Sequence, residues 1–134
     1  MIFTEAELRY LVEHPLGRLA TIGSEGAPQV NPVTFRVNPG TGTVDIGGPA
    51  FSASRKFRNV QGNPHVSFVI DDAAEEPNVF GQRGRGVEVR GEARIVTLDP
   101  PLMAMFDAET IRIHPRRIVA WNIDGVGYNA RDVV

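Results

Sequence analysis

Hydrophobic and polar residues alternate along most of the chain beyond residue 16, which is the pattern of strands with one buried face. The segment VEVRGEARIV at 87–96 alternates throughout, with Gly91 on its apolar side, where a bend or a close approach of another strand is expected. Short turns such as SEGA and NPGTG separate the alternating segments, so neighbouring strands are expected to pair antiparallel. The predicted strands are RLATIG, PQVNPVTFRV, TVDIGG, HVSFVIDD, VEVRGEARIV, TIRIHP and RRIVAWNID. The pattern predicts a mainly β fold whose six or seven strands form a closed or nearly closed barrel.

Two or three short helices complete the predicted fold. Residues 3–14 begin with the capping-box spacing of Thr4 and Glu7, which marks a helix start. The apolar stripe of this helix is predicted to consist of Leu8, Leu11 and Val12. A second helix is predicted at 52–62, with Phe57 and Val60 facing inward and Asn63-Pro64 ending it. The segment PPLMAMFDAE at 100–109 is the candidate third helix.

Composition and charge narrow the class of protein. The chain has 134 residues, of which 42% are hydrophobic and 22% charged, with a formal net charge of −2, so residues 1–134 are expected to form one domain. The charge balance argues against non-specific nucleic-acid binding and against an anionic membrane surface. No apolar run approaches the roughly 20 residues of a membrane span, and no signal-peptide pattern opens the chain. Because there is no cysteine, thiolate chemistry and disulfides are excluded, and a cytoplasmic protein is expected.

The strongest candidate for a binding site lies at 47–64, GGPAFSASRKFRNVQGNP. A strand ends in Gly47-Gly48, and a helix then begins with Ser54 followed by the cations Arg55 and Lys56. Free backbone N–H groups at a helix N-terminus favour an anion. Cations at this positive end of the helix are unfavourable unless an anion such as a phosphate lies between them. The alternative is that both cations are solvated surface residues.

Other motifs carry weaker signals. The three histidines are scattered and none has metal-ligand spacing with another ligand, so no metal site is predicted. Asp71-Asp72 and Glu75-Glu76 are expected to form a solvated rim. The glycines of GQRGRG lack the strand–turn–helix frame of a dinucleotide fingerprint and fit a hairpin connection. No catalytic residue is assigned from these motifs.

Five segments carry a family resemblance that spans about residues 3–132. They are LGRLATIGSEGAPQVNPV, VDIGG, SRKFRNVQGNP, RGVEVRGEARI and IRIHPRRIVAW. In this order they resemble the split-barrel flavin- and deazaflavin-binding proteins, a group that includes the pyridoxamine-phosphate oxidases. The most similar branch is that of the F420-dependent oxidoreductases.

The resemblance implies a six-stranded antiparallel split β-barrel with two or three short helices. It implies a homodimer with the cofactor at the subunit interface, a small-molecule substrate, and no nucleic-acid or membrane partner. The basic helix start would hold the cofactor phosphate, the strand NPVT would present its backbone to the ring, and the glycine pair would pass close to the ribityl chain. The implied cofactor-binding residues are Asn31, Pro32, Val33, Thr34, Gly47, Gly48, Ser54, Arg55 and Lys56.

The implied function is hydride transfer between reduced coenzyme F420 and an electron-poor double bond, such as an enone or a quinone-like ring. Asn31 stands where flavin oxidases of the group often have arginine, which argues against oxidation of pyridoxamine phosphate. The alternatives are an FMN-dependent reductase or oxidase and a non-catalytic flavin- or deazaflavin-binding protein.

Several further residues are open to two interpretations. Tyr128 is a candidate proton donor or a packing residue, and Trp121 either crosses a subunit interface or belongs to the core. The role of the loop at 73–86 stays open. The arginines available to an anionic cofactor tail, or else solvated, are Arg83, Arg85, Arg116 and Arg117.

Overall fold

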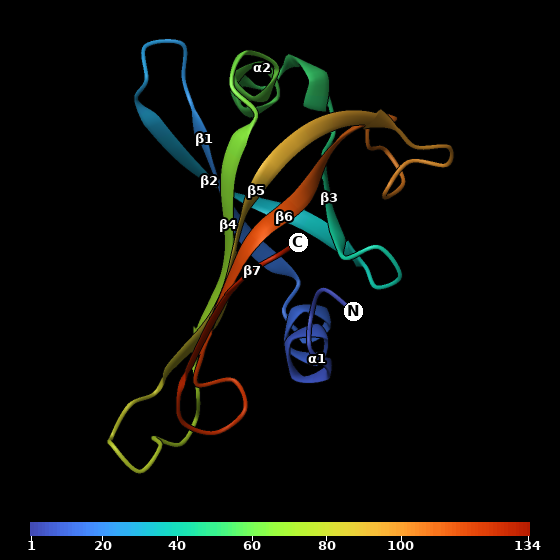
Figure 1. The fold of residues 1–134 in the computed structure, drawn as a ribbon. Helices are drawn as coiled ribbons and strands as arrows, with labels where there is room; N and C mark the ends of the chain where they lie inside the picture. The colour runs from blue at the N-terminus through green and yellow to red at the C-terminus, as the bar shows by residue number, and fades with distance from the viewer.

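The computed structural model describes residues 1–134, and its elements follow the alternation of the sequence. Figure 1 shows strands that curve around a common core, with one helix at the top and another near the chain ends below. The helices are α1 (Glu5–Glu13), the 3-10 turn η1 (Phe51–Ala53) and α2 (Arg55–Gly62). The strands are β1 (Leu16–Ile22), β2 (Pro28–Asn38), β3 (Thr43–Gly47), β4 (His65–Ala73), β5 (Gly84–Thr97), β6 (Glu109–Trp121) and β7 (Tyr128–Asp132).

All strand pairs are antiparallel, and the sheet closes on itself. The strand order is β3-β2-β1-β4-β5-β6-β7, and an additional pairing of β3 with β6 closes the barrel. In this closing pair Ile46 lies opposite Ile111 and Val44 opposite Ile113. The predicted six-stranded antiparallel barrel is therefore confirmed. An extra strand that the alternation did not reveal, β7, pairs with the C-terminal half of β6.

The barrel is filled by a single apolar cluster. The face of β5 predicted to point inward carries Val87, Val89, Ala93 and Ile95; the first three are buried, and Ile95 is half-buried against the core cluster. The α2 residues Phe57 and Val60 join the same cluster, as the helical spacing predicts.

Helix α1 has the predicted start but a different buried face. Thr4 and Glu7 form both hydrogen bonds of the capping box, at 2.9 and 3.1 Å. Val12, predicted in the apolar stripe, is 75% exposed, and this prediction is wrong. Leu11 is buried as predicted and Leu8 packs against the core half-buried, while Glu7 and Tyr10 are buried in addition. The helix turns this face inward because Arg131 of β7 pairs with the Glu7 carboxylate and so permits its burial.

Two other predictions about secondary structure are wrong. The segment at 100–109 forms no helix; it is part of a loop that connects β5 to β6 and closes with a hydrogen bond from Leu98 N to Ala108 O of 2.9 Å. Pro100 and Pro101 have no backbone N–H. A helix through them would lack these two hydrogen-bond donors, and the segment forms a loop instead.

The segments TIRIHP and RRIVAWNID, predicted as two strands, belong to one strand, β6, that passes through Pro115. The register of β5 against β6 shifts between Arg90 and Gly91, which places Gly91 opposite Pro115. Proline has no backbone N–H to donate to the ladder, and such a residue is tolerated at an irregularity of this kind. The expected close approach at Gly91 is confirmed, because a Cβ atom there would collide with the carbonyl oxygen of His114.

Helix α1 is anchored to the ends of β4 and β5 through one carboxylate. Asp72 receives two hydrogen bonds from Arg85, of 2.7 and 2.9 Å, and one of 2.6 Å from the hydroxyl of Tyr10. His14 lies 3.3 Å from the same carboxylate. The hydrogen bonds from Arg85 hold the pKa of Asp72 well below its ordinary range. Burial, together with the bond to Asp72, raises the pKa of Tyr10.

The contribution of Asp72 to stability is therefore expected to depend on pH in the acid range. A carboxylate whose folded pKa is lowered stabilises the protein above its unfolded pKa, about 3.9, and loses that effect as the pH falls towards the folded pKa. We expect Asp72→Asn to lower the free energy of unfolding by about 1–3 kcal/mol at pH 7. Urea denaturation should show this deficit shrinking below about pH 4. Asp132→Asn, at an aspartate that is 79% exposed, is the control and should show little deficit at any pH.

Candidate functional site

A groove of about 310 Å³ lies between β2, the end of β3 and the start of α2. It brings together seven of the residues implied as cofactor-binding: Pro32, Val33, Thr34, Gly47, Gly48, Ser54 and Lys56. Three further side chains from neighbouring segments complete its wall: Pro49, Phe51 and Phe106. Residues far apart in the sequence thus converge on one side of the barrel.

The groove opens where β2 and β3 separate. Pairing of these strands begins at Thr34 opposite Gly47, and β2 residues before Thr34 pair only with β1. Over 28–33, the edge of β2 that faces away from β1 therefore has no strand partner. Backbone groups at such an edge can hydrogen-bond to a ligand. This is the geometry that the strand NPVT needs to present its backbone to a ring.

Gly47 and Gly48 shape the floor of the groove through contacts within the chain. A Cβ atom on Gly47 would lie 3.3 Å from the ring of Phe106, and one on Gly48 would lie 3.3 Å from the ring of Phe51. Both glycines thus leave space for aromatic rings of the protein itself. Only their backbone atoms remain to line the groove, which lets a ligand approach the main chain closely.

The positive end of the groove is the start of α2. Ser54 is the N-cap residue: its hydroxyl accepts a hydrogen bond from Phe57 N at 3.4 Å and donates one to Phe51 O at 2.7 Å. The ammonium of Lys56 lies 5.7 Å from the centroid of the Phe51 ring and makes no ion pair with any carboxylate. An anion in the groove would therefore meet an uncompensated cation beside a helix N-terminus.

Two of the implied residues lie outside this groove. Asn31 is exposed and lies opposite Leu19 of β1. Arg55 lines a separate cleft of about 660 Å³ between α2 and the β1–β2 turn, together with Arg58 and Asn59. Adjacent residues of a helix point about 100° apart, so Arg55 and Lys56 face different hollows.

The loop between β5 and β6 supplies site residues that the sequence patterns did not reveal. Phe106 lines the groove, and Asp107 accepts hydrogen bonds from the backbone N and the hydroxyl of Ser52, at 3.0 and 3.1 Å. Asp107 N also donates to Gly48 O at 3.0 Å. These bonds hold the loop against η1. No local motif marks Phe106, because its role depends on where the loop folds back.

The four arginines considered for an anionic tail are engaged elsewhere in this chain. Arg85 pairs with Asp72, and Arg83 donates from Nε to Ala74 O at 2.8 Å. The two others, on β6, pair with Glu92 and Asp132; they are Arg116 and Arg117.

The aromatic candidates flank the turn between β6 and β7, and this turn lies at the far end of the barrel from α2 (Figure 1). Trp121 is half-buried and covers Gly86, where a Cβ atom would come within 2.6 Å of the indole. Tyr128 lies opposite Trp121 on β7 and is 76% exposed. Within one chain, neither residue reaches the groove.

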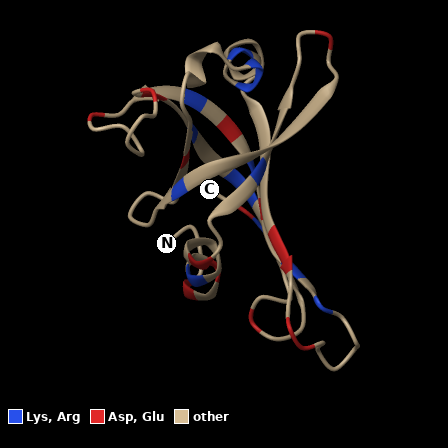
Figure 2. Ribbon diagram, turned by 180° about the vertical axis from the view of Figure 1, so that it is seen from behind, with Lys and Arg blue, Asp and Glu red and all other residues tan.

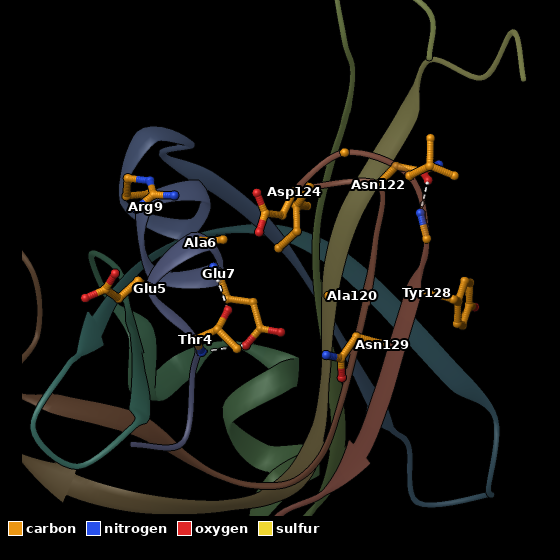
Figure 3. Close-up of a pocket in the computed structure, with 14 residues that line it drawn as sticks. Thr4, Glu5, Ala6, Glu7, Arg9, Ala120, Asn122, Asp124, Tyr128 and Asn129 are labelled. Atoms are coloured by element: carbon orange, nitrogen blue, oxygen red, sulfur yellow. Dashed lines mark hydrogen bonds between the residues drawn. The ribbon is translucent and has the colours of Figure 1, made fainter. Parts of the chain in front are cut away.

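A third hollow, of about 540 Å³, separates α1 from the β6–β7 hairpin. Figure 3 shows Thr4 and Glu7 on the helix side, and Asn122, Tyr128 and Asn129 on the strand side. The polar side chains of Thr4 and Glu7 already have partners, because together they form the capping box and the buried Glu7 also binds Arg131. This pocket is larger than the groove at α2, but it contains none of the residues implied for cofactor binding.

Two observations bear on metals and membranes. No three histidine or carboxylate side chains come close enough together to hold a metal ion. Neither helix has the length and apolar character that crossing a bilayer requires.

The closed antiparallel barrel with a groove beside it places the protein in the split-barrel class of cofactor-binding proteins. The sequence matches the pyridoxamine 5'-phosphate oxidase family over residues 3–129, and the chain belongs to that family. It is 42% identical, over 99% of its own length and 94% of the relative's, to a 5a,11a-dehydrotetracycline/5a,11a-dehydrooxytetracycline reductase of Streptomyces rimosus.

Solved structures agree with this fold. A conserved hypothetical protein of Mycobacterium tuberculosis has a TM-score of 0.70 and 23% identity, covering 92% of this chain and 88% of its own. A heme binding protein of Mycobacterium smegmatis also has a TM-score of 0.70, with 16% identity over 98% of this chain and 59% of its own.

Proposed function

We propose that this protein is an oxidoreductase that uses reduced coenzyme F420 to reduce an electron-poor carbon–carbon double bond in a small molecule. The observation that carries the proposal is the 42% identity to a dehydrotetracycline reductase over nearly the whole chain. The "dehydro" in that relative's substrate name denotes a missing pair of hydrogens. Saturating such a bond takes a hydride and a proton. When bound, the reduced deazaflavin supplies the hydride.

The groove fits a cofactor that has a flat ring and a phosphate. The unpaired β2 edge at 28–33 offers backbone groups to the edge of a ring. The aromatic side chains of Phe51 and Phe106 provide apolar walls. We assign the phosphate to the start of α2, where Ser54 and Lys56 line the groove and Arg55 flanks it from the neighbouring cleft.

Three alternatives have less support. FMN has the same ring shape and one phosphate, so the groove also fits an FMN-dependent reductase or oxidase. A protein that binds a flavin or deazaflavin without turnover has the same groove, but the similarity to a reductase favours catalysis. Haem iron takes His, Met, Cys or Tyr ligands, and none of these residue types lines the groove.

The test compares the cofactors directly. Purified protein is incubated with 5a,11a-dehydrotetracycline and a panel of simple enones, with either reduced F420 or reduced FMN, and loss of the substrate chromophore is followed. We expect turnover with reduced F420. Turnover with reduced FMN alone would establish the FMN alternative, and cofactor binding without reduction of any substrate would establish the non-catalytic one.

We further propose that the protein acts as a homodimer with the cofactor at the subunit interface. The groove supports this because the edge of β2 over 28–33, which borders it, has no strand partner within the chain. A second subunit would cover that opening and exclude water from the ring.

A further inference from the structure

A hollow of about 490 Å³ lies beside the groove, bordered by the end of α1, by β2 and by the β5–β6 loop at 98–108. Figures 1 and 2 show α1 and this loop on the same side of the barrel. We call the space the Met103 hollow, after the loop residue that lines it. Most of the residues around it are apolar, as in sites that bind small molecules.

The hollow meets the groove at one residue of β2. Thr34 lines both, and β2 changes partners there, because Thr34 pairs with Leu16 of β1 and with Gly47 of β3. The edge of β2 that faces away from β1 is unpaired over 28–33, and the edge that faces away from β3 is unpaired over 35–38. The groove opens along the first edge and the hollow along the second, so molecules bound in the two would lie side by side.

The β5–β6 loop borders both spaces. Phe106 lines the groove and Met103 lines the hollow, and Phe106 N donates a hydrogen bond to Met103 O at 3.2 Å. The loop is also bound to the end of β3, because Asp107 N donates to Gly48 O at 3.0 Å. Hydrogen bonds of the chain itself therefore fix the position of one space relative to the other.

Two apolar side chains at the hollow are left uncovered by the rest of the chain. Val12 is 75% exposed and Met103 is 52% exposed. The groove, at about 310 Å³, is at the lower end of the range for sites that take one small molecule, about 300–1,000 Å³, so a cofactor there leaves no room for a substrate. The hollow supplies the space and the apolar surface that a second ring system needs.

Arg36 is the one lysine or arginine that lines the hollow. Its Nη2 lies 3.7 Å from Oδ2 of the buried Asp45, which is too long for a hydrogen bond. Asp45 already accepts two hydrogen bonds from Arg112, of 2.8 and 3.0 Å, and one of 3.0 Å from Asn38. The half-exposed guanidinium of Arg36 is therefore free to bind an anionic oxygen.

The second basic side chain of the hollow is not free. The two ring nitrogens of His14 face Tyr10 O at 2.6 Å and the carboxylate of Asp72 at 3.3 Å. The hollow thus offers one free cation beside a mostly apolar wall. This combination fits an apolar ring system that carries a single negative charge.

We infer that the Met103 hollow binds the substrate, and that the substrate is a fused-ring enone or quinone with an anionic oxygen. The rings lie against Val12 and Met103, and the oxygen binds Arg36. This rests on the proposed function in one respect: a cofactor in the groove is what would reduce the molecule bound beside it.

The first test measures charge recognition by calorimetric titration of purified protein without cofactor. The probes are 2-hydroxy-1,4-naphthoquinone, whose enol is ionised at pH 7, and 2-methoxy-1,4-naphthoquinone, which has the same rings and no charge. Arg36→Met should raise the dissociation constant of the hydroxy compound about tenfold, the lower end of the range for a hydrogen bond between charged groups because Arg36 is half-exposed. The dissociation constant of the methoxy compound should hardly change. No binding by the wild type, or equal effects of Arg36→Met on the two compounds, would overturn the inference.

The second test locates the rings. Val12→Asp places a carboxylate on the apolar wall at an exposed position, and it should weaken binding of both compounds, the anionic one more. Val126→Asp is the matched control, because Val126 is also exposed but lines the hollow between α1 and the β6–β7 hairpin. Equal effects of Val12→Asp and Val126→Asp would contradict the assignment of the rings to the Met103 hollow.

The titrations separate this inference from the proposed function. Binding with the expected pattern, but no reduction by F420 or FMN, would contradict the proposed function and leave the binding site standing. Normal reduction together with unchanged affinities in Arg36→Met and Val12→Asp would contradict the site and leave the proposed function standing.

Discussion

Replacing Arg131 by methionine is expected to lower the free energy of unfolding by about 3–5 kcal/mol, the range for removing one partner of a buried ion pair. The guanidinium of Arg131 binds both carboxylate oxygens of Glu7, at 2.6 and 2.9 Å, and also Ile2 O at 2.7 Å. The side chain of Glu7 is only 2% exposed, so without Arg131 its charge is buried without compensation. Chemical denaturation at pH 7 measures the loss.

Arg117→Met is the matched control, because Arg117 pairs with Asp132, which is 79% exposed. An exposed pair of this kind contributes less than about 1 kcal/mol. The double variant Glu7→Gln with Arg131→Met should recover part of the loss, since it also removes the buried charge. Equal losses for Arg131→Met and Arg117→Met would show that the Glu7–Arg131 pair does not hold α1 to β7.

Lys56→Ala is expected to weaken cofactor binding by about 1.5–3 kcal/mol, the range for a hydrogen bond to a charged group. This corresponds to roughly a 10- to 150-fold higher dissociation constant. The reason is that Lys56 is the unpaired cation that lines the groove at the start of α2. Fluorescence titration with F420 and with FMN measures the effect for each cofactor.

The control for Lys56→Ala is Arg94→Ala, at an exposed arginine of β5 that lines none of the pockets described. Its dissociation constants should equal those of the wild type. Lys56→Arg should retain most of the affinity because it keeps the charge. Lys56 also lies over the Phe51 ring, so the melting temperature of each variant must be compared. Unchanged affinity of Lys56→Ala for both cofactors would remove the phosphate assignment.

Much of the fold could be predicted because its signals are local. The capping box of Thr4 and Glu7 spans one helical turn, and the alternation at 87–96 encodes a strand with one buried face. The glycine pair followed by Ser54 marks the end of β3 and the start of α2. The segment that carries most of the groove is likewise continuous in sequence, which is why it could be found.

Other features depend on residues brought together only by folding. The burial of Glu7 depends on Arg131, 124 positions away, and the helical spacing alone placed Val12 in the buried stripe, where it does not lie. Pro115 interrupts a local strand pattern, but the register shift opposite Gly91 lets β6 continue. Local propensity could not reveal either result, because the deciding partner lies on another strand.

By itself the sequence determined a mainly β barrel, a helix with a basic start after two glycines, and membership of a cofactor-binding family. Only the tertiary structure decided that Lys56 faces the groove while Arg55 faces a different cleft. Neighbouring helix residues point about 100° apart, and the segments that fold around the helix determine which surface each side chain meets. The tertiary structure likewise decided that Phe106 lines the groove, because the fold-back of the β5–β6 loop rests on hydrogen bonds between Asp107 and residues more than 50 positions earlier. Neighbouring residues determine strand patterns and helix starts, whereas the walls of a site come from segments that meet only in the folded barrel.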